Sequence, residues 1–412
     1  MTRRGALSIL ATLGLVTSGA VAASVPAHAD PPAQEVLFVA NNWDGTASVL
    51  SSGADLTPVG EINVIPDREQ RMREIYRDPI RLTAFLVIRE TVGEGHDQFA
   101  DDMYTTPDGS SLVVSRPSFA DVVSISLATG EVEWRFRVSG LRADHMSVSP
   151  DGTQVAVSAS TGNRVHVLDI ETGDEAGSFP TGDKPHENIY TSDGLIWNMS
   201  IGEVNNDLDA PALDFLKGDR VITVADAETF EVVREIDMRE RLDDAGMGHL
   251  SDAVRPAAFS PDESKLYFQV SFFGGFLEYD VASDRITRVK TLPGVFDGRR
   301  DQMVNDSRHH GLAMEPTGEH LCVAGTMDDY AVVVDRATLA EGPLVDVAKP
   351  YWTTVTGDGA ACVVSESEAD QVTSIDFGTG QKIGSVPVGD HPQRVRLGTV
   401  PAGWSGPTAQ VG

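Results

Sequence analysis

The amino-acid sequence predicts an all-β fold: a single seven-bladed β-propeller, closed by strands from both ends of the chain, with loop insertions on one face. Three observations support this prediction. A turn of the Pro-Asp-Gly kind recurs along the chain, each copy is followed by a second strand–turn–strand unit, and unpaired strands remain at both ends. Repeats spaced by a few tens of residues are typical of propellers and other repeat folds.

The first 29 residues have the features of a cleaved signal peptide. Arg3 and Arg4 give a short cationic start, an apolar run follows, and Ala27-His28-Ala29 is a small-x-small cleavage site. The apolar run is too short and too rich in small residues to favour a permanent membrane anchor. We therefore expect a secreted, extracellular protein. General secretion is favoured over twin-arginine export, for which Arg3-Arg4 is the alternative signal.

Six segments share the pattern of a short strand, a tight turn and an alternating apolar strand. They are "TTPDGSSLVVS" at 105–115, "VSPDGTQVAVS" at 148–158, "YTSDGLIWNMS" at 190–200, "FSPDESKLYFQ" at 259–269, "MEPTGEHLCVA" at 314–324 and "VTGDGAACVVS" at 355–365. Each is followed by another strand, a turn and a strand, as in "RVHVLDIETGDEAGSF". The two units together make one four-stranded blade, so the sequence predicts six complete blades.

The two ends of the mature chain predict a seventh, split blade. Residues 389–400 supply an inner strand, and residues from about 35–65 supply the other three. Such closure leaves no free sheet edge in the ring. We therefore expect one propeller domain over residues 30–400 and a C-terminal tail over residues 401–412.

Four segments are longer than a blade connection requires. They lie at 66–95, 202–219, 239–253 and 293–308. All belong to loops between second and third strands or to blade-to-blade connections, which lie on the same face of an antiparallel blade. The first contains "DREQRMREIYRD", which is typical of a short helix. Loops of this length are usually functional, so we expect them to surround the mouth of the central channel.

The repeats resemble the secreted YVTN-repeat propellers, which are grouped with the heavy chains of quinoprotein amine dehydrogenases. The resemblance rests on "VGDHPQRV" at 388–395, "TGDKPHENIYTSDG" at 181–194 and "LRADHMSVSPDGTQVAVS" at 141–158. It covers nearly the whole mature chain. It implies the propeller fold, which hosts many activities.

Charge and cysteine content limit the partners of the chain. A net charge of −30 repels phosphate backbones, so we expect no nucleic-acid partner. After the N-terminal run, no segment is apolar enough to predict a membrane span. Cys322 and Cys362 occupy equivalent points of two successive repeats. Buried thiols and a disulfide both remain open for an exported chain.

Seven of the nine histidines after residue 29 stand shortly before an inner strand. These are His96, His145, His186, His249, His309, His310 and His391. A blade comes closest to the ring axis at the start of its inner strand, so these side chains should converge on one mouth. Imidazole is the commonest side-chain ligand of zinc, copper, iron and nickel.

We therefore predict a metal site that holds copper, zinc, iron or manganese. The candidate ligands are His145, His186, His310, His309, His96 and His249, of which the first three are favoured. Neighbouring residues of an extended strand point to opposite sides, so we expect only one of His309 and His310 to be a ligand. The alternative is that each histidine caps its own strand by a hydrogen bond.

Other polar residues at the same level are candidates for catalysis. They are Glu187, Asp102, Arg255 and Tyr351. The carboxylates, with Asp101 and Asp144, would orient ligands or act as a base. Arg255, with Arg394, would hold an anionic group of a substrate, and Tyr351 with Trp352 would form an aromatic wall.

The predicted function is a secreted metal-dependent enzyme, a lyase or an oxidoreductase, that acts on a small molecule or a glycan fragment. The imidazole ring resembles that of nitrous oxide reductases, although the chain lacks their cupredoxin domain and paired-cysteine copper motif. Propeller lyases with an axial histidine and a divalent metal are a second parallel. The alternative function is a non-catalytic extracellular propeller that binds a protein, a cell-wall polymer or a metal. A third option is a subunit of an exported quinoprotein-like complex, whose partner supplies the cofactor.

Overall fold

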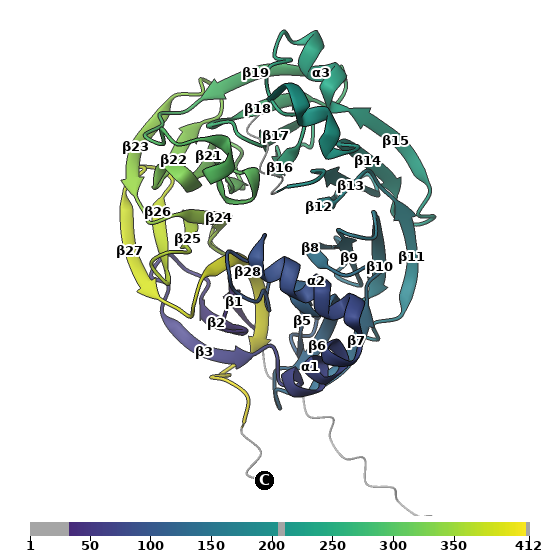
Figure 1. Cartoon of the computed structure of the whole chain (residues 1–412). Coiled ribbons are helices and arrows are strands. Elements are labelled where there is room, and N and C mark those ends of the chain that lie inside the picture. The colour runs from purple at the N-terminus through teal and green to yellow at the C-terminus, as the bar shows by residue number, and fades with distance from the viewer. Residues whose placement is uncertain (1–32, 205–210, 409–412) are drawn as a thin grey trace, which may run out of the picture. The chain divides into compact units, whose positions relative to one another are not determined.

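The computed structural model describes residues 33–204 and 211–408. The predicted signal peptide, residues 1–29, lies outside the described residues. Within them the chain forms seven antiparallel four-stranded sheets, arranged as blades around a common axis (Figure 1). This confirms the all-β, seven-bladed propeller predicted from the sequence.

Blades 1 to 6 each consist of four strands in chain order, with the first strand innermost (Figure 1). Blades 1 and 2 contain β4 (Met103–Thr105), β5 (Ser111–Arg116), β6 (Asp121–Ser126), β7 (Val132–Arg137), β8 (Ala143–Val148), β9 (Gln154–Ala159), β10 (Arg164–Asp169) and β11 (Glu175–Pro180). Blades 3 and 4 contain β12 (Pro185–Tyr190), β13 (Leu195–Ser200), β14 (Val221–Asp226), β15 (Val232–Asp237), β16 (Val254–Phe259), β17 (Lys265–Val270), β18 (Gly275–Asp280) and β19 (Arg285–Thr291). Blades 5 and 6 contain β20 (Leu312–Met314), β21 (His320–Gly325), β22 (Tyr330–Asp335), β23 (Glu341–Asp346), β24 (Pro350–Val355), β25 (Ala361–Glu366), β26 (Gln371–Asp376) and β27 (Lys382–Pro387).

The closing blade joins the two ends of the propeller. Its strands are ordered β28 (Pro392–Pro401), β1 (Ala33–Asn41), β2 (Thr46–Ser51) and β3 (Pro58–Asn63). The C-terminal strand is therefore innermost and pairs antiparallel with the first strand, as at Phe38 and Arg396. Residues that follow β28 attach to blade 1, since the Trp404 indole Nε1 donates to the Leu127 carbonyl at 2.6 Å.

The recurring turn is stabilised by its own side chains. In blade 2 the Asp151 carboxylate accepts hydrogen bonds from the Ser149 hydroxyl at 2.6 Å and the Thr153 amide at 3.1 Å. The next residue, Gly152, has a φ of 75°, a backbone conformation that glycine adopts without steric cost. The same hydroxyl-to-aspartate bond recurs at Thr106 and Asp108 of blade 1. This local bonding explains why the sequence signature is visible in otherwise divergent blades.

The predicted insertions contain the helices of the propeller. They are α1 (Arg68–Arg77), α2 (Pro79–Glu90), the 3₁₀ helix η2 (Pro211–Lys217), α3 (Met238–Asp244) and the short 3₁₀ turns η3 (Arg300–Gln302) and η4 (Val304–Asp306). Two further 3₁₀ turns, η1 (Pro117–Phe119) and η5 (Thr326–Asp328), lie between strands of blades 1 and 5. The sequence predicted one helix in segment 66–95, whereas the structure has two. Asp78 explains the second, because its carboxylate accepts from the Ile80 and Arg81 amides and Pro79 follows as the first helical residue. Among the described residues, no helix is both long and apolar enough to cross a bilayer.

Contacts between the insertions confirm that they share one face. The Asn305 side chain donates to the Val92 carbonyl at 3.4 Å, which links segment 293–308 to segment 66–95. Arg300 pairs with Asp214 of η2 at 2.7 Å. Arg220 pairs at 2.6 Å with Asp252, which lies in the connection that contains α3. The four insertions therefore form one continuous layer over the ring.

The helical hairpin is anchored in the propeller core. Ile75 of α1 and Phe85 of α2 join the apolar cluster between the closing blade and blade 1. Beside it, the fully buried Arg116 pairs with Asp121 at 2.8 Å and with Asp67, next to α1, at 2.6 Å. A buried arginine needs such partners, because an uncompensated charge inside a protein is costly. The hairpin is therefore held in place beside the ring axis.

Cys322 and Cys362 form a disulfide whose Cα atoms are 6.2 Å apart. The bond joins β21 to β25, the second strands of blades 5 and 6. Of the two alternatives that the sequence left open, the structure has the disulfide.

This cross-link predicts a loss of stability in a cysteine-free variant. A disulfide constrains the unfolded chain and typically contributes about 2–4 kcal/mol. Replacing both Cys322 and Cys362 by Ala should therefore lower the free energy of unfolding by about that amount, as measured by urea denaturation. Treating the wild type with reductant should give the same loss. An unchanged free energy of unfolding in either experiment would contradict the cross-link.

Candidate functional site

Interruptions of the β-ladder bring polar side chains to the ring axis. In β8, Asp144 and His145 together oppose one residue of β9, because the register moves from Ala143–Ala159 to Met146–Val157. The inner strands β12, β16 and β28 have the same two-against-one irregularity, and β24 has a shift at Tyr351. A β-bulge of this kind bends the strand and redirects its side chains. Equivalent points of successive blades thus present their side chains at one level.

Two sets of residues occupy these bulges. The first bulge residues are Asp144, His186, Arg255, Gln393 and, in β24, Tyr351, with Asp101 and His310 at the corresponding points before β4 and β20. The second bulge residues are His145, Glu187, Pro256 and Arg394, with Asp102 and Trp352 at the corresponding points. Every inner strand therefore contributes to the axis.

A small cavity lies among these residues. Its volume is about 30 Å³, and Asp101, Asp144, His145, His186, Arg255, Tyr351 and Gln393 contribute to its wall. Val92 and Asn305 of the insertions complete that wall. On this measure a cavity needs roughly 10–15 Å³ to hold one water molecule. The cavity therefore has room for an ion or about two waters, and is too small for an organic substrate.

Asp144, His145 and His186 form a potential metal-binding group. All three are buried, and one donor atom of each lies within 4.8 Å of the others. His145 Nε2 is 3.7 Å from Asp144 Oδ1 and 3.9 Å from Asp101 Oδ2. Donors bound to one ion at about 2.1 Å lie at most about 4.2 Å apart, so small shifts would bring these three onto one ion.

The contacts of His145 Nδ1 decide whether the opposite nitrogen can bind a metal. Nδ1 is 2.8 Å from Glu187 Oε2 and 2.5 Å from Arg394 Nη2. Only one of these contacts can be a hydrogen bond while Glu187 is ionised, since the carboxylate then requires a proton on Nδ1 and Arg394 requires its absence. An ionised Glu187 selects the protonated Nδ1, which leaves Nε2 as a free donor toward Asp144. This carboxylate–histidine pairing is usual for metal ligands.

His310 faces the same group from blade 5. Its Nδ1 donates to the Tyr351 carbonyl at 3.0 Å, which leaves Nε2 unprotonated. Nε2 is buried and has no hydrogen-bond partner among the described residues, and the same holds for His186 Nδ1 and Asp101 Oδ2. Buried polar atoms are nearly always paired, so the unpaired atoms of His186 and Asp101 in the cavity wall, with His310 Nε2 close to His186, indicate a missing ion or water. The His310 ring centroid is 5.6 Å from that of His186 and 6.3 Å from that of His145.

Paired charges fill the axis beside the cavity. Arg394 stacks on Trp352 with its Cζ atom 3.6 Å from the ring centroid. Arg396 makes two 2.8 Å bonds to Asp102. Asp102 also accepts from the Met146 amide at 3.0 Å. Asp102 and Arg394 are therefore engaged with protein groups and support the imidazoles from the side.

Burial sets the protonation of the site. It raises the pKa of Asp101 to about 8, with a further contribution from the charge of Asp144. It also raises the pKa of Glu187 to about 7, against the opposing charge of Arg394. Burial and nearby positive groups lower the pKa values of His145, His186 and His310 well below the ordinary value. The imidazoles are therefore neutral, the form that binds metals.

The structure places the other predicted residues as follows. Arg255 lines the cavity but donates to the Ser271 hydroxyl at 2.9 Å and to the Asn305 carbonyl. His309 turns away from the axis, where its Nε2 is 2.9 Å from Asp328. His96 and His249 are exposed on the insertions, and His96 stacks on Trp43 with ring centroids 3.8 Å apart. The structure does not bring these three histidines to the cluster. The positions of His96 and His249 depend on loop paths, whereas His309 points to the opposite side from its neighbour His310, as predicted for an extended strand.

Sequence reasoning treated Asp144 as an orienting residue and not as a ligand. The repeat could have identified Asp144 as a ligand, because Asp144 occupies the same bulge position as His186. Arg142 was also missed. It pairs with Asp144 and donates to the Ser160 hydroxyl at 3.2 Å, which holds the carboxylate at the cavity wall.

A second, wider cavity adjoins the first. Its volume is about 260 Å³, and it shares Val92, Arg142, Asp144, Ile201 and Val204 with the axial cavity. Its remaining wall comes from α2 and from the ends of β9 and β13, and includes Val87, Ile88, Thr91, Ser160, Thr161, Lys184, Gly202 and Glu203. We call this cavity the vestibule. It is large enough for a small organic molecule, and Asp144 forms part of both walls.

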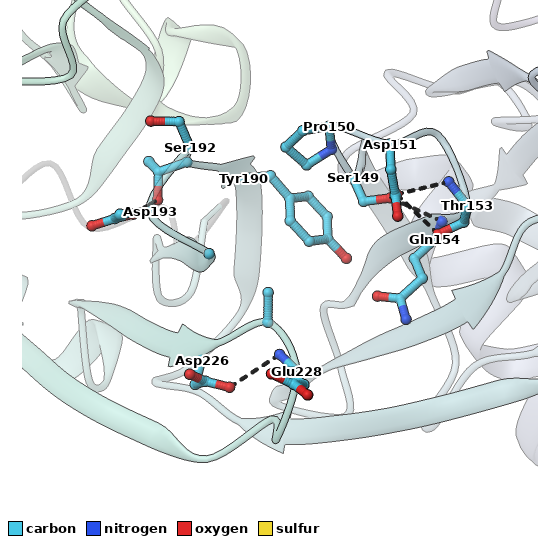
Figure 2. Close-up of a pocket in the computed structure, with 13 residues that line it drawn as sticks. Ser149, Pro150, Asp151, Thr153, Gln154, Tyr190, Ser192, Asp193, Asp226 and Glu228 are labelled. Carbon is cyan, nitrogen blue, oxygen red and sulfur yellow. Dashed lines mark hydrogen bonds between the residues drawn. The ribbon is translucent and has the colours of Figure 1, made fainter.

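Another hollow, of about 510 Å³, lies between turns of blades 2 and 3. Figure 2 shows Tyr190 between the turn that contains Asp151 and the turn that contains Asp193. Its acidic groups are used locally, since Asp193 accepts from the Thr191 hydroxyl at 2.6 Å and Asp226 accepts from the Thr229 amide at 2.7 Å. This hollow is therefore a by-product of the repeated turns and not a candidate site.

A further group of potential metal ligands lies on the turn between β20 and β21. It consists of Glu315, Glu319 and His320, and His320 Nδ1 is 2.8 Å from Glu315. Glu319 is exposed and the other two are half-buried. Solvent competes for such ligands, so the buried axial group is the stronger candidate.

Comparison with known proteins identifies the fold alone. No family model matches the chain, and no curated protein does. Among solved structures, a chain of hydrazine synthase from Kuenenia stuttgartiensis matches with a TM-score of 0.59 and 16% sequence identity, over 87% of this chain and 99% of that chain. The resemblance to YVTN-repeat propellers therefore remains a prediction.

The buried carboxyls predict how stability depends on pH. Unfolded Asp101 ionises near pH 3.8, whereas folded Asp101 keeps its proton up to about pH 8, so stability falls as the pH rises between these values. The buried histidines have the opposite effect, but only below their ordinary pKa of 6.5. Between pH 6.5 and 8 the carboxyl effect therefore dominates.

In that window the metal-free protein should lose about 1 kcal/mol of unfolding free energy per pH unit. Asp101→Asn should remove most of this loss and make the rise below pH 6.5 steeper, because the Asp101 carboxyl no longer opposes the histidines there. Urea denaturation across the window measures both curves. Parallel curves for wild type and variant would show that Asp101 is not the responsible group.

Proposed function

We propose that the axial cluster binds one metal ion and makes the protein a metal-dependent enzyme for a small molecule. His145, His186 and Asp144 would be the ligands, with His310 and Asp101 facing the ion. One observation carries the proposal: three buried donor atoms lie within 4.8 Å of one another, beside a cavity that has room for a single ion.

The chemistry of the three ligand side chains limits which metals the site could bind. Two imidazoles and one carboxylate suit first-row metals such as iron, copper, zinc and manganese. Three protein ligands with an open position are typical of catalytic sites, whereas structural sites are closed. When bound, such an ion would polarise a substrate oxygen or exchange electrons with it.

The vestibule supports a small substrate. Its volume of about 260 Å³ is below that of pockets for drug-sized ligands, which start at about 300 Å³. An oligosaccharide would therefore extend beyond it. The wall combines apolar Val87, Ile88 and Ile201 with the cationic Lys184, which suits a molecule with an apolar body and a polar group directed at Asp144.

Residues of the chain would position this chemistry. Glu187 fixes the tautomer of His145. In the metal-free protein Asp101, whose pKa is about 8, carries a proton at the cavity wall at neutral pH. Tyr351 lines the same wall. Asp102 and Arg255 would act as positioning residues, because protein groups already engage them.

We infer that the protein is exported and works outside the cell. The sequence of residues 1–29 is typical of a signal peptide. The Cys322–Cys362 disulfide supports this inference, because disulfides persist in oxidising compartments.

The alternative function, binding of a protein partner, has its own support. Of the thirteen large apolar side chains exposed on the described residues, eight lie on the insertions. They are Tyr76, Ile80, Leu86, Val87, Leu213, Phe215, Leu216 and Val295. Apolar exposure of this kind is common at interaction surfaces. Such a partner would dock on the face that holds the vestibule.

Metal binding tests the proposed function. The wild type, stripped with chelator and incubated with Cu²⁺, Zn²⁺ or Fe²⁺, should retain one equivalent of at least one of these metals through a desalting column. His145→Ala and His186→Ala should each abolish retention, because each removes a ligand. Glu187→Gln should weaken binding by about 10–100-fold, as losses of ligand-orienting groups do. Elemental analysis and titration calorimetry give both results.

Two control variants sharpen this test. His249→Ala, on an exposed part of the insertions, should bind metal like the wild type. His320→Ala removes the ligand group on the β20–β21 turn and should also keep the equivalent. The proposal is wrong if the wild type retains no metal, or if His320→Ala loses it while the axial variants keep it.

A further inference from the structure

A row of aromatic rings connects the axial cluster to the protein surface. From the axis outward, the rings are His186, His310, Tyr351, His391, Trp43 and His96. Successive ring centroids are 5.6, 4.4, 6.4, 3.7 and 3.8 Å apart. The last residue, His96, is exposed. The row therefore begins at a proposed metal ligand and ends in solvent.

The outer part of the row is a stack of three nearly parallel rings. The indole of Trp43 lies between the imidazoles of His391 and His96, with interplanar angles of 4° and 8°. The three residues come from distant segments: Trp43 follows β1, His96 precedes β4, and His391 precedes β28. His391 Nε2 is buried without a hydrogen-bond partner among the described residues.

Tyr351 joins the stack to the axis. Its side chain lines the axial cavity, and its ring contacts those of His310 and His391. Its backbone carbonyl accepts a hydrogen bond from His310 Nδ1 at 3.0 Å, which fixes the two rings relative to each other. The inner and outer parts of the row therefore meet at one residue.

Carboxylates surround the outer end of the row. Asp370 accepts from the His391 amide at 3.0 Å, and Asp44 accepts from the Asp390 amide at 2.9 Å. Burial and the charges of Asp370 and Asp44 raise the pKa of Asp390. Glu94 lies 4.0 Å from His391 Nε2 and pairs with Lys349 Nζ at 2.6 Å, so the excess negative charge comes from the aspartates. This concentration of negative charge attracts cations, as does the net charge of −30.

We propose that this row of rings transfers single electrons between a redox-active metal at the axial site and a cationic one-electron carrier that docks beside His96. The proposal rests on the proposed function, because it needs the metal ion. The metal loses one electron and the carrier gains one. The rings act as a bridge, so no bond changes and no proton moves. Aromatic rings in contact shorten the saturated gaps that slow electron tunnelling through a protein.

Oxidation of bound copper by a bulky reagent tests the transfer. Protein loaded with Cu⁺ under argon is mixed with tris-phenanthroline cobalt(III), a cationic one-electron oxidant too large for the 30 Å³ cavity. Freeze-quench electron paramagnetic resonance follows the appearance of Cu²⁺. Trp43→Leu removes a ring far from the metal and should slow the reaction by about an order of magnitude.

Matched variants separate loss of the ring from loss of structure. Trp43→Phe keeps an aromatic ring in the stack and should retain most of the wild-type rate, even if it destabilises the joint as much as Leu does. Trp134→Leu, in β7 outside the row, should react like the wild type. Thermal unfolding and copper content are measured for each variant.

The outcomes distinguish this proposal from the proposed function. A slow Trp43→Leu with full copper content and a fast Trp43→Phe support the row of rings as the path. Equal rates for all variants with full copper content would overturn the path and leave the metal site intact. A wild type that retains only Zn²⁺ would overturn the electron transfer and leave the proposed metal site intact, whereas a wild type that retains no metal would overturn both.

Discussion

The axial site depends on closure of the ring, because closure holds all seven inner strands around one axis. Seven inner strands surround one axis, and the last of them, β28, pairs in its sheet with β1 from the other end of the chain. Most inner strands have a register irregularity at the same level. Closure and bulges together gather imidazoles, carboxylates and guanidinium groups from remote segments. No local sequence motif is needed to assemble such a group.

Gathering so many ionisable groups away from water has an energetic consequence. Most of them are compensated: Arg396 by Asp102, Arg394 by Trp352, and Asp144 by Arg142. Among the groups that lack a partner within the described residues, Asp101, which keeps a proton, and a nitrogen atom of His186 lie in the wall of one cavity, and a nitrogen atom of His310 lies close to them. Burying unpaired polar groups is unfavourable, and a bound cation would satisfy all three. The unpaired atoms are thus the physical sign of the site.

The sequence predicted the parts of the structure that local bonding determines. The repeated turn identified the blades, because a hydroxyl and an aspartate stabilise each copy, and the leftover strands identified the closing blade. The position of His145, His186 and His310 followed from their place before inner strands. The paths of the long insertions could not be predicted from the sequence, since tertiary contacts determine them. For that reason His96 and His249 were expected near the axis, and α2 was not expected. The role of Asp144 depends on a bulge, which alternation along a strand does not reveal.

Anomalous diffraction from crystals of metal-loaded protein tests the central claim most directly, because it locates the ion without reference to activity. The account predicts one strong peak at the ring axis, bonded to Asp144 and to nitrogens of His145 and His186 at about 2.1 Å. A peak only at Glu315 and His320, or an axial cavity that holds water in the presence of excess metal, would contradict it.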